Sequence, residues 1–141
     1  MSALYRTLFA LLIAAAWITP ASAVQQAFLV QNSGWMEPFY TDPSSQLKPL
    51  VAAVAGAVAS PGDRLALMAF SQTSGTNVSP RALGDIGSAG AIMPALSGLT
   101  LAHKNGPTSA LADTDFQEAI GSVIRTTFQA KPGIIWIFTN N

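Results

Sequence analysis

The chain has 141 residues, of which 50% are hydrophobic and 10% are charged, so we expect one domain with a substantial buried core and do not expect intrinsic disorder. Seven basic side chains balance seven acidic ones without any run of like charges, which argues against a nucleic-acid-binding surface. The absence of cysteine excludes disulfides, thiol catalysis and cysteine-ligated zinc.

Residues 1–23 have the three parts of a signal peptide. Arg6 gives a positive start, residues 8–18 form an uninterrupted apolar run, and the small-residue pattern Ala21-Ser22-Ala23 follows. We therefore expect a mature chain that starts at Val24 and is exported to the periplasm, the cell envelope or the medium. An uncleaved membrane anchor is the alternative, but an apolar run of about a dozen residues is short of the roughly 20 that span a bilayer.

The first half of the mature chain predicts a strand and a helix. Gln26 to Val30 is a short apolar run that leads into a polar turn over 31–35, and Glu37 to Tyr40 is expected to be a loop. Asp42-Pro43 is a helix start signal, although Pro49 means that the helix kinks or begins nearer Lys48. The helix is expected to place on one face Leu47, Leu50, Val51, Val54 and Val58.

The second half predicts two more strands and two more helices. Residues 64–71 are apolar on both faces, and 72–80 form a polar, hairpin-like stretch with a short edge strand as one alternative. Residues 88–101 are expected to be a helix and 102–112 a loop. Asp113 is expected to cap a helix over 114–129 that buries Phe116, Ile120, Val123, Ile124 and Phe128. Residues 133–141 are expected to form the last strand.

This order of elements predicts an α/β fold with a doubly wound, mostly parallel sheet and helices on both faces. The last strand is apolar on both faces at 134–138, as a central strand would be, yet little of the chain follows it. We therefore expect residues 24–141 to be the N-terminal portion of a longer domain whose C-terminal part is missing.

Three segments with oxygen-bearing side chains are expected to meet at the carboxyl end of this sheet, where ligands bind in α/β proteins. They are the turn at Gln31–Trp35, the helix start at Asp113–Asp115 and the residues Thr139–Asn141 after the last strand. Such a convergence is typical of a Mg²⁺ or Mn²⁺ site.

The layout resembles the von Willebrand factor type A (vWA) domain, whose metal-ion-dependent adhesion site combines Asp-x-Ser-x-Ser with a distant Thr and a distant Asp. Residues 31–36, Gln-Asn-Ser-Gly-Trp-Met, are similar to the Asp-x-Ser-Gly-Ser-Met form of its first motif. Residues 60–71 resemble its turn and second strand, Thr114 its threonine, and Phe138-Thr139-Asn140-Asn141 the strand ending that usually contains Thr-Asp-Gly. The resemblance extends over 24–141 and implies a protein-binding or adhesion module.

Carried onto this chain, the resemblance implies a ligand-binding set of Gln31, Ser33, Trp35, Thr114 and Asn140. Ser33 and Thr114 keep the metal-ligating hydroxyls. Gln31 and Asn140 replace both carboxylates with neutral amides, and Trp35 replaces the second serine. Because a hard divalent cation loses most of its electrostatic attraction in such a site, we expect a metal-independent, non-enzymatic module with a protein partner and no cofactor. Membrane attachment would come through residues beyond 141 or an uncleaved leader.

Two alternatives stay open. In the first, Glu37 or Asp115 supplies the missing carboxylate, and the site is a Mg²⁺-dependent adhesion site. In the second, Ser33 with His103 and an aspartate forms an exported serine hydrolase, although no G-x-S-x-G elbow surrounds Ser33. An apolar and aromatic cluster beside the turn is either packing or a contact patch for a partner, and it consists of Trp35, Met36, Phe39 and Tyr40.

Overall fold

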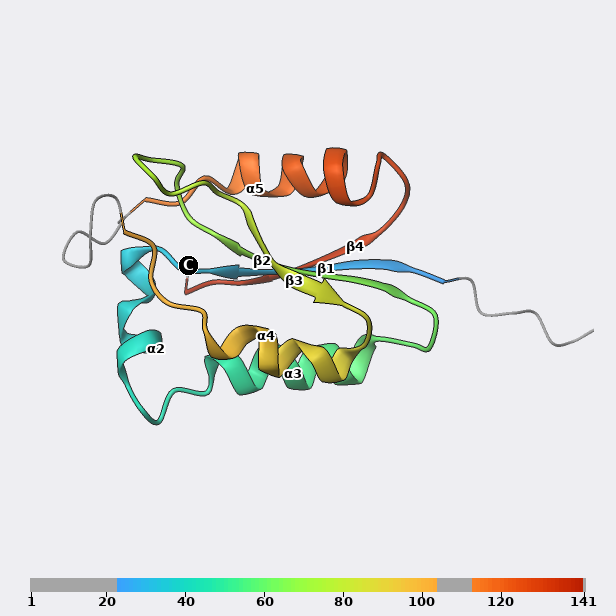
Figure 1. Ribbon diagram of the computed structural model, residues 1–141, viewed down its shortest axis with the longest axis horizontal. Helices are drawn as coiled ribbons and strands as arrows, with labels where there is room; N and C mark the ends of the chain where they lie inside the picture. Colours follow the sequence, from blue (N-terminus) through green and yellow to red (C-terminus); the bar gives the residue numbers. More distant parts are fainter. Residues whose placement is uncertain (1–22, 104–112, 141) are drawn as a thin grey trace, which may run out of the picture.

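The computed structural model describes residues 23–103 and 113–140, which form an α/β fold (Figure 1). Four strands, in the spatial order β3-β2-β1-β4, make one sheet: β1 (Gln25–Gln31), β2 (Arg64–Phe70), β3 (Arg81–Ile86) and β4 (Ile134–Phe138). β1 pairs in parallel with β2 and with β4, whereas β3 runs antiparallel to β2. The predicted α/β class and the mostly parallel pairing are therefore confirmed.

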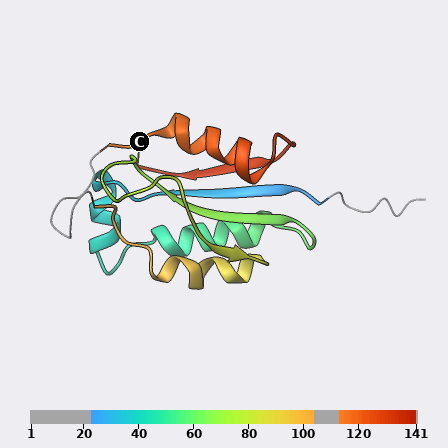
Figure 2. The ribbon, with the colours of Figure 1, turned by 45° about the horizontal axis from the view of Figure 1, so that its top comes forward.

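Helices cover both faces of the sheet (Figures 1 and 2). α3 (Leu47–Val58) and α4 (Ile92–Ser97) pack on one face, and α5 (Phe116–Ser122) with the π-helical segment η3 (Val123–Thr127) on the other. Side chains along β1 alternate between the two layers, since Phe28 and Val30 face α3 while Ala27 and Leu29 face α5. This double coverage explains why β1 is apolar throughout its centre.

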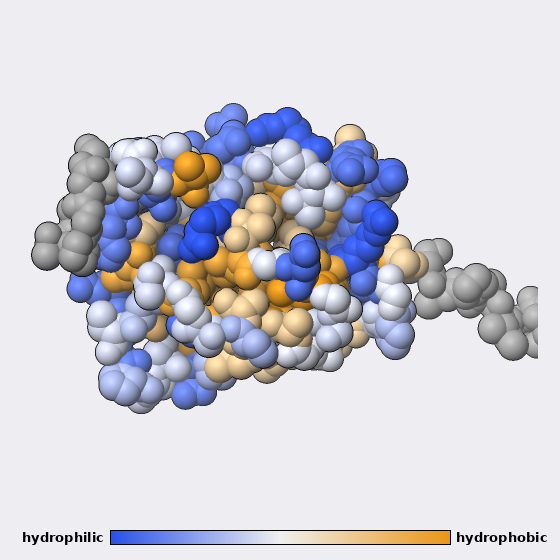
Figure 3. Space-filling view, in the orientation of Figure 1, coloured by the Kyte–Doolittle hydropathy of each residue, from blue (hydrophilic) through white to orange (hydrophobic). Residues whose placement is uncertain are grey.

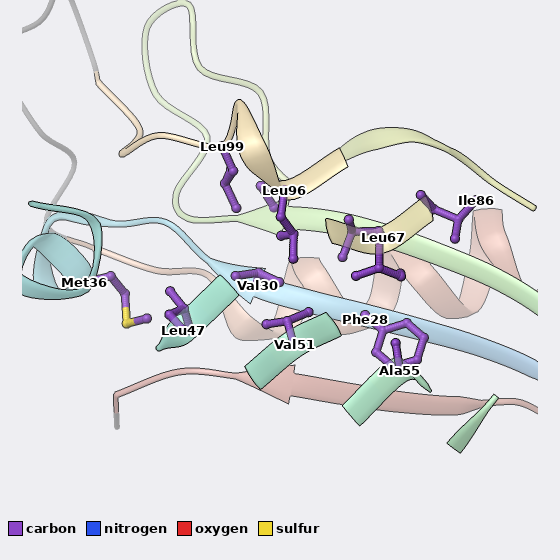
Figure 4. Packing of buried hydrophobic residues seen from close by; sticks show 12 residues of the cluster. Phe28, Val30, Met36, Leu47, Val51, Ala55, Leu67, Ile86, Leu96 and Leu99 are labelled. Carbon is purple, nitrogen blue, oxygen red and sulfur yellow. The ribbon is translucent and has the colours of Figure 1, made fainter. Parts of the chain in front are cut away.

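The layer beneath α3 is the larger of the two cores. Figure 4 shows Phe28 and Val30 of β1 packed among Val51 and Ala55 of α3 and Leu96 of α4, and all five are fully buried. In the space-filling view, hydrophobic residues gather across the middle of the molecule, at the level of the sheet (Figure 3). Burial of these side chains supplies most of the driving force for this arrangement.

The N-terminal helices differ from the sequence-based expectation. Residues 37–40, predicted to be a loop, lie in α2 (Glu37–Thr41), which follows the 3-10 turn η1 (Gly34–Met36). Pro38 is compatible with α2 because it occupies the first turn, where no N–H is needed. Asp42-Pro43 does not start α3, because the Asp42 carboxylate instead accepts hydrogen bonds from the backbone N–H and hydroxyl of Ser44. The alternative start near Lys48 is confirmed.

Two residues predicted to face the core are exposed. Leu50 is 53% exposed, because the buried stripe of α3 is centred on Val51 and consecutive helical residues are about 100° apart. Ile124 is 45% exposed because it lies in the π-helical segment, whose wider turn changes the spacing of the buried side chains. Val123 and Phe128 of this region are buried as predicted.

Other boundaries shift as well. The edge strand proposed within 72–80 lies later, at β3, and 72–80 contains only an isolated bridge between Ser74 and Asn77. The helix expected over 88–101 is shorter, since a 3-10 turn η2 (Ala89–Ala91) precedes α4. Asp115 rather than Asp113 caps α5, because its carboxylate accepts the backbone N–H of Glu118 at 2.8 Å.

The buried side-chain amide of Gln26 links several elements at the amino end of the sheet. Gln26 is 2% exposed, and its Nε2 donates to Oδ2 of Asp63 at 2.8 Å and to the carbonyl of Val58 at 3.2 Å. Its Oε1 accepts from Nε1 of Trp136 at 2.9 Å. One side chain therefore joins β1 to the end of α3, to the turn before β2 and to β4.

β4 lies at an edge of the described sheet and hydrogen-bonds to β1 alone there. Ile134 and Ile137 are 45% and 37% exposed. Within the described ranges, no helix combines the length and the hydropathy needed to cross a membrane. Apart from Ala23, the predicted signal peptide lies outside the described residues.

Gly133 permits a close approach just before β4. A Cβ at this position would overlap the buried ring of Phe128, which packing prevents from moving away. We therefore predict that Gly133→Ala lowers the free energy of unfolding by about 1–3 kcal/mol, measured by urea denaturation. The control is Gly56→Ala on the exposed surface of α3, where no atom lies within 4 Å, and it should stabilise by about 0.5–1 kcal/mol. Unchanged stability of the Gly133 variant would contradict this packing.

Candidate functional site

Three loops meet at the carboxyl end of the sheet, as the sequence predicts. β1 and β4 are parallel and end side by side, since Val30 is paired with Phe138. The turn after β1 therefore lies next to the residues that follow β4, and the segment that precedes α5 reaches the same place through Thr114. Side chains from widely separated parts of the sequence are thus brought together.

The side chain of Gln31 is the centre of this region. It is fully buried, and its Nε2 donates one hydrogen bond to Oγ of Ser33 and one to Oγ1 of Thr114, each at 2.7 Å. Its Oε1 accepts the hydroxyl of Thr139. Both amide hydrogens and the amide oxygen are therefore satisfied, as a buried amide requires.

The two hydroxyls that the vWA resemblance implies as metal ligands accept from one nitrogen. Mg²⁺ would hold hydroxyl oxygens at about 2.0–2.1 Å in octahedral geometry. Here a neutral amide nitrogen joins Ser33 and Thr114 at longer, hydrogen-bonding distances. Because the surrounding donor set also contains no carboxylate, these residues do not fit a hard divalent cation.

The carboxylates proposed as substitutes point elsewhere. Asp115 is exposed and caps α5, and Glu37 is exposed in the first turn of α2. Among residues 23–103 and 113–140, no group of three or more His, Asp and Glu side chains could hold a metal ion. The Mg²⁺-dependent alternative therefore gains no support from this arrangement.

Asn140 contacts Trp35, and neither side chain is hydrogen-bonded to the hydroxyls of Ser33 and Thr114. Trp35 is 65% exposed, and its backbone carbonyl accepts a hydrogen bond from Nδ2 of Asn140 at 2.7 Å. Asn140 thus ties the turn after β1 to the end of β4. The hydrogen bond places the Asn140 amide on the backbone of Trp35 and not in the cluster around Gln31, and the indole of Trp35 is left exposed to solvent.

Two residues that contact Gln31 were not predicted as site residues: Thr139 was expected only within the segment after the last strand, and Tyr40 only within the aromatic cluster. Thr139 lies level with Gln31 once the pairing of Val30 with Phe138 is known, so strand register is the signal that would have found it. Tyr40 donates its hydroxyl to the backbone carbonyl of Gln31 at 2.9 Å from α2. The backbone and the side chain of Gln31 are therefore both held.

Asn32 fixes the turn from the other side. It is 5% exposed, and its Nδ2 donates to the carbonyl of Thr100 at 3.1 Å. Its backbone N–H donates to the carbonyl of Phe70, and its carbonyl accepts from Ala102. The turn is consequently anchored to the end of β2 and to the segment that follows α4, as well as to the end of β4.

The serine hydrolase alternative lacks a catalytic pair. Ser33 is fully buried and its hydroxyl accepts from Gln31, while no hydrogen bond joins it to His103. Nδ1 of His103 is buried without a hydrogen-bond partner in the described part of the chain. A nucleophile needs both a base and access to substrate, and neither is seen at Ser33.

An apolar groove of about 370 Å³ adjoins the site. Met36 and Phe39 line it from the turn and α2, Leu50 from α3, and Ile137 and Thr139 from the end of β4. Thr139 therefore separates the buried polar cluster from an open apolar surface. The predicted aromatic cluster is divided in the same way, since Met36 is buried while Trp35 and Phe39 are exposed.

Burial raises the pKa of the Tyr40 phenol well above its ordinary value near 10. The folded protein therefore keeps a proton that the unfolded chain loses, so its stability is full below pH 10 and falls as the pH rises further. We predict a loss of about 1.4 kcal/mol in the free energy of unfolding per pH unit above 10. Tyr40→Phe should remove this part of the slope.

Residues 24–141 contain no tyrosine other than Tyr40, so phenolate absorbance of the processed protein reports this group alone. Ionisation near pH 10 in the folded protein would contradict the burial of the Tyr40 phenol.

A scan against protein-family models, a search of curated proteins and a search of solved structures each returned no significant match. The vWA resemblance therefore stays a prediction from the motifs and their order.

Proposed function

We propose that this chain is an exported, protein-binding module of the vWA type in which the side chain of Gln31 takes the place of a metal ion. The observation that carries the proposal is the bridging amide, which donates to Ser33 and to Thr114 and accepts from Thr139. In the resembled family a cation would link these segments. Here one neutral group links them, and no cofactor is required.

The strand order supports a vWA-like arrangement within the α/β class. The order β3-β2-β1-β4, with one antiparallel edge strand and helices on both faces, is compatible with a doubly wound sheet. The first motif follows the central strand β1, and Thr114 precedes the helix that covers the opposite face from α3.

The surface around the site supports a protein as the ligand. Trp35 is 65% exposed, and Phe39 and Leu50, which line the adjacent groove, are 42% and 53% exposed. Large apolar side chains grouped on a surface mark contact sites, and aromatic residues are enriched in protein interfaces. The backbone of Trp35 is held by Asn140, so the loop that carries the indole is already ordered before a partner contacts it.

A charge-restoring double substitution tests the site. Gln31→Asp places a carboxylate beside the hydroxyls of Ser33 and Thr114, and Asn140→Asp adds the second carboxylate of the family pattern in the segment after β4. We predict that this variant binds Mg²⁺ at about millimolar concentrations, measured by calorimetry, and that the parent protein does not. Adding Ser33→Ala to the double variant should abolish the binding.

The matched control carries the same charge change at the other end of the helical segment, at two exposed residues, as Thr126→Asp with Gln129→Asp. It should not bind Mg²⁺. A Mg²⁺ signal in the parent protein that Ser33→Ala removes would overturn the metal-free site.

The contact surface is tested by site-specific photo-crosslinking in cells that export the protein. A photoreactive residue at Trp35 or at Phe39 should form an adduct with one partner, whereas the same residue at exposed Ile124 on η3 should not. Trp35→Ala should then weaken binding of that partner at least about tenfold, because aromatic anchors dominate interface energies. Adducts that form equally at all three positions would argue against this surface.

A further inference from the structure

The backbone nitrogen of Val24 contacts the carboxylate of Asp63 at the amino end of the sheet. Val24 N donates to Oδ1 of Asp63 at 2.8 Å, and the Val24 carbonyl accepts from the N–H of Arg64 at 2.9 Å. This position is set by the register of β1 on β2, in which Gln25 is paired with Arg64. The nitrogen is therefore placed by the sheet itself.

The Asp63 carboxylate has three N–H donors and no cation. Oδ2 accepts from the backbone of Ser60 at 2.9 Å and from the side chain of Gln26 at 2.8 Å. The hydrogen bonds from Ser60, Val24 and Gln26 hold the pKa of this carboxyl below its ordinary value. In the described part of the chain the one ion pair joins Arg125 and Glu118, so Asp63 carries a negative charge without a charged partner.

The sequence places a predicted cleavage point at the same nitrogen. The pattern Ala21-Ser22-Ala23 ends immediately before Val24, and Ala23 is exposed. We propose that hydrolysis of the Ala23–Val24 bond by a signal peptidase creates an α-ammonium group that forms an ion pair with Asp63. The proposal rests on the export proposed above, and it is independent of the site around Gln31.

The chemistry needs only water and the peptidase. Water adds across the peptide bond, so that Ala23 leaves with a new carboxylate and the nitrogen of Val24 becomes an amine. The amine takes a proton and has three N–H groups in place of one. One of them keeps the existing bond to Oδ1, which becomes a charge-assisted hydrogen bond.

Few other charges face this nitrogen. The turn over 59–62, residue 65 and the loop over 87–89, which surround Asp63, contain no ionisable side chain. Arg64 follows Asp63 directly, and Lys131 precedes Pro132, whose carbonyl accepts from Nε2 of Gln25; both cationic residues are exposed. Asp63 is therefore the group that controls the proton affinity of the new amine.

The test uses the full chain, expressed in a bacterium that exports it, with the N-terminus of the recovered protein read by mass spectrometry. The α-amine is then titrated through its rate of reaction with an amine-acylating reagent, followed by peptide mapping. We expect Val24 as the first residue, with an α-amino pKa about one unit above the ordinary 7.7–8.0. At pH 7 the amine should therefore react about tenfold more slowly than in Asp63→Asn.

Asp42→Asn is the matched control, because Asp42 also accepts hydrogen bonds from neighbouring backbone and side-chain groups but is remote from Val24 in the fold. It should react as the parent does. An N-terminus other than Val24, an ordinary α-amino pKa, or equal rates in the parent and Asp63→Asn would each overturn the proposal. If Asp63→Asn does not fold, the titration of the parent decides alone. None of these failures affects the Mg²⁺ experiments, which address the other end of the sheet.

Discussion

The buried amide of Gln31 is the interaction on which the carboxyl end of this protein depends. It is the point at which the turn after β1, the start of α5 and the end of β4 are joined. The occupancy of a metal site in this place would depend on the concentration of the ion. An amide, in contrast, is part of the chain, and its hydrogen bonds form when the chain folds. In the proposed function, the surface beside this amide therefore forms on folding and needs no ion from the surroundings.

In the proposed function, the division between buried and exposed side chains around this amide lets one turn serve both structure and recognition. Ser33 and Met36 point inward and are buried, while Trp35 between them points outward. Asn140 holds the backbone of Trp35 and leaves its indole free. The polar cluster thus provides rigidity, and the neighbouring apolar groove provides area, so that each supplies what the other lacks as a binding surface.

Much of this could be predicted from the sequence, and the errors have identifiable causes. Continuous apolar runs identified β1, β2 and β4, and the expected meeting of Gln31, Ser33 and Thr114 follows from parallel strands. The hydrogen-bond partners of the Gln31 side chain could not be predicted from the sequence. They depend on the register of β1 and β4, which brings Thr139 level with Gln31. Leu50 and Ile124 were misplaced because helix phase and a π-helical turn are set by packing that a periodic pattern does not contain. The resemblance to vWA domains indicated the residues, but not that the amide would bridge the hydroxyls.

β1 carries a buried glutamine near each end, and the two serve opposite layers. Gln26 contacts the carbonyl of Val58 in α3, whereas Gln31 contacts Thr114 just before α5. They are an odd number of residues apart, and side chains alternate along a strand, so each amide meets its partners in one alignment only. A shift of β1 by one position would carry both amides to the wrong layer and leave them without partners in an apolar interior. The two glutamines therefore favour the observed register of β1, because a misaligned pairing that a purely apolar strand would tolerate leaves both amides without partners.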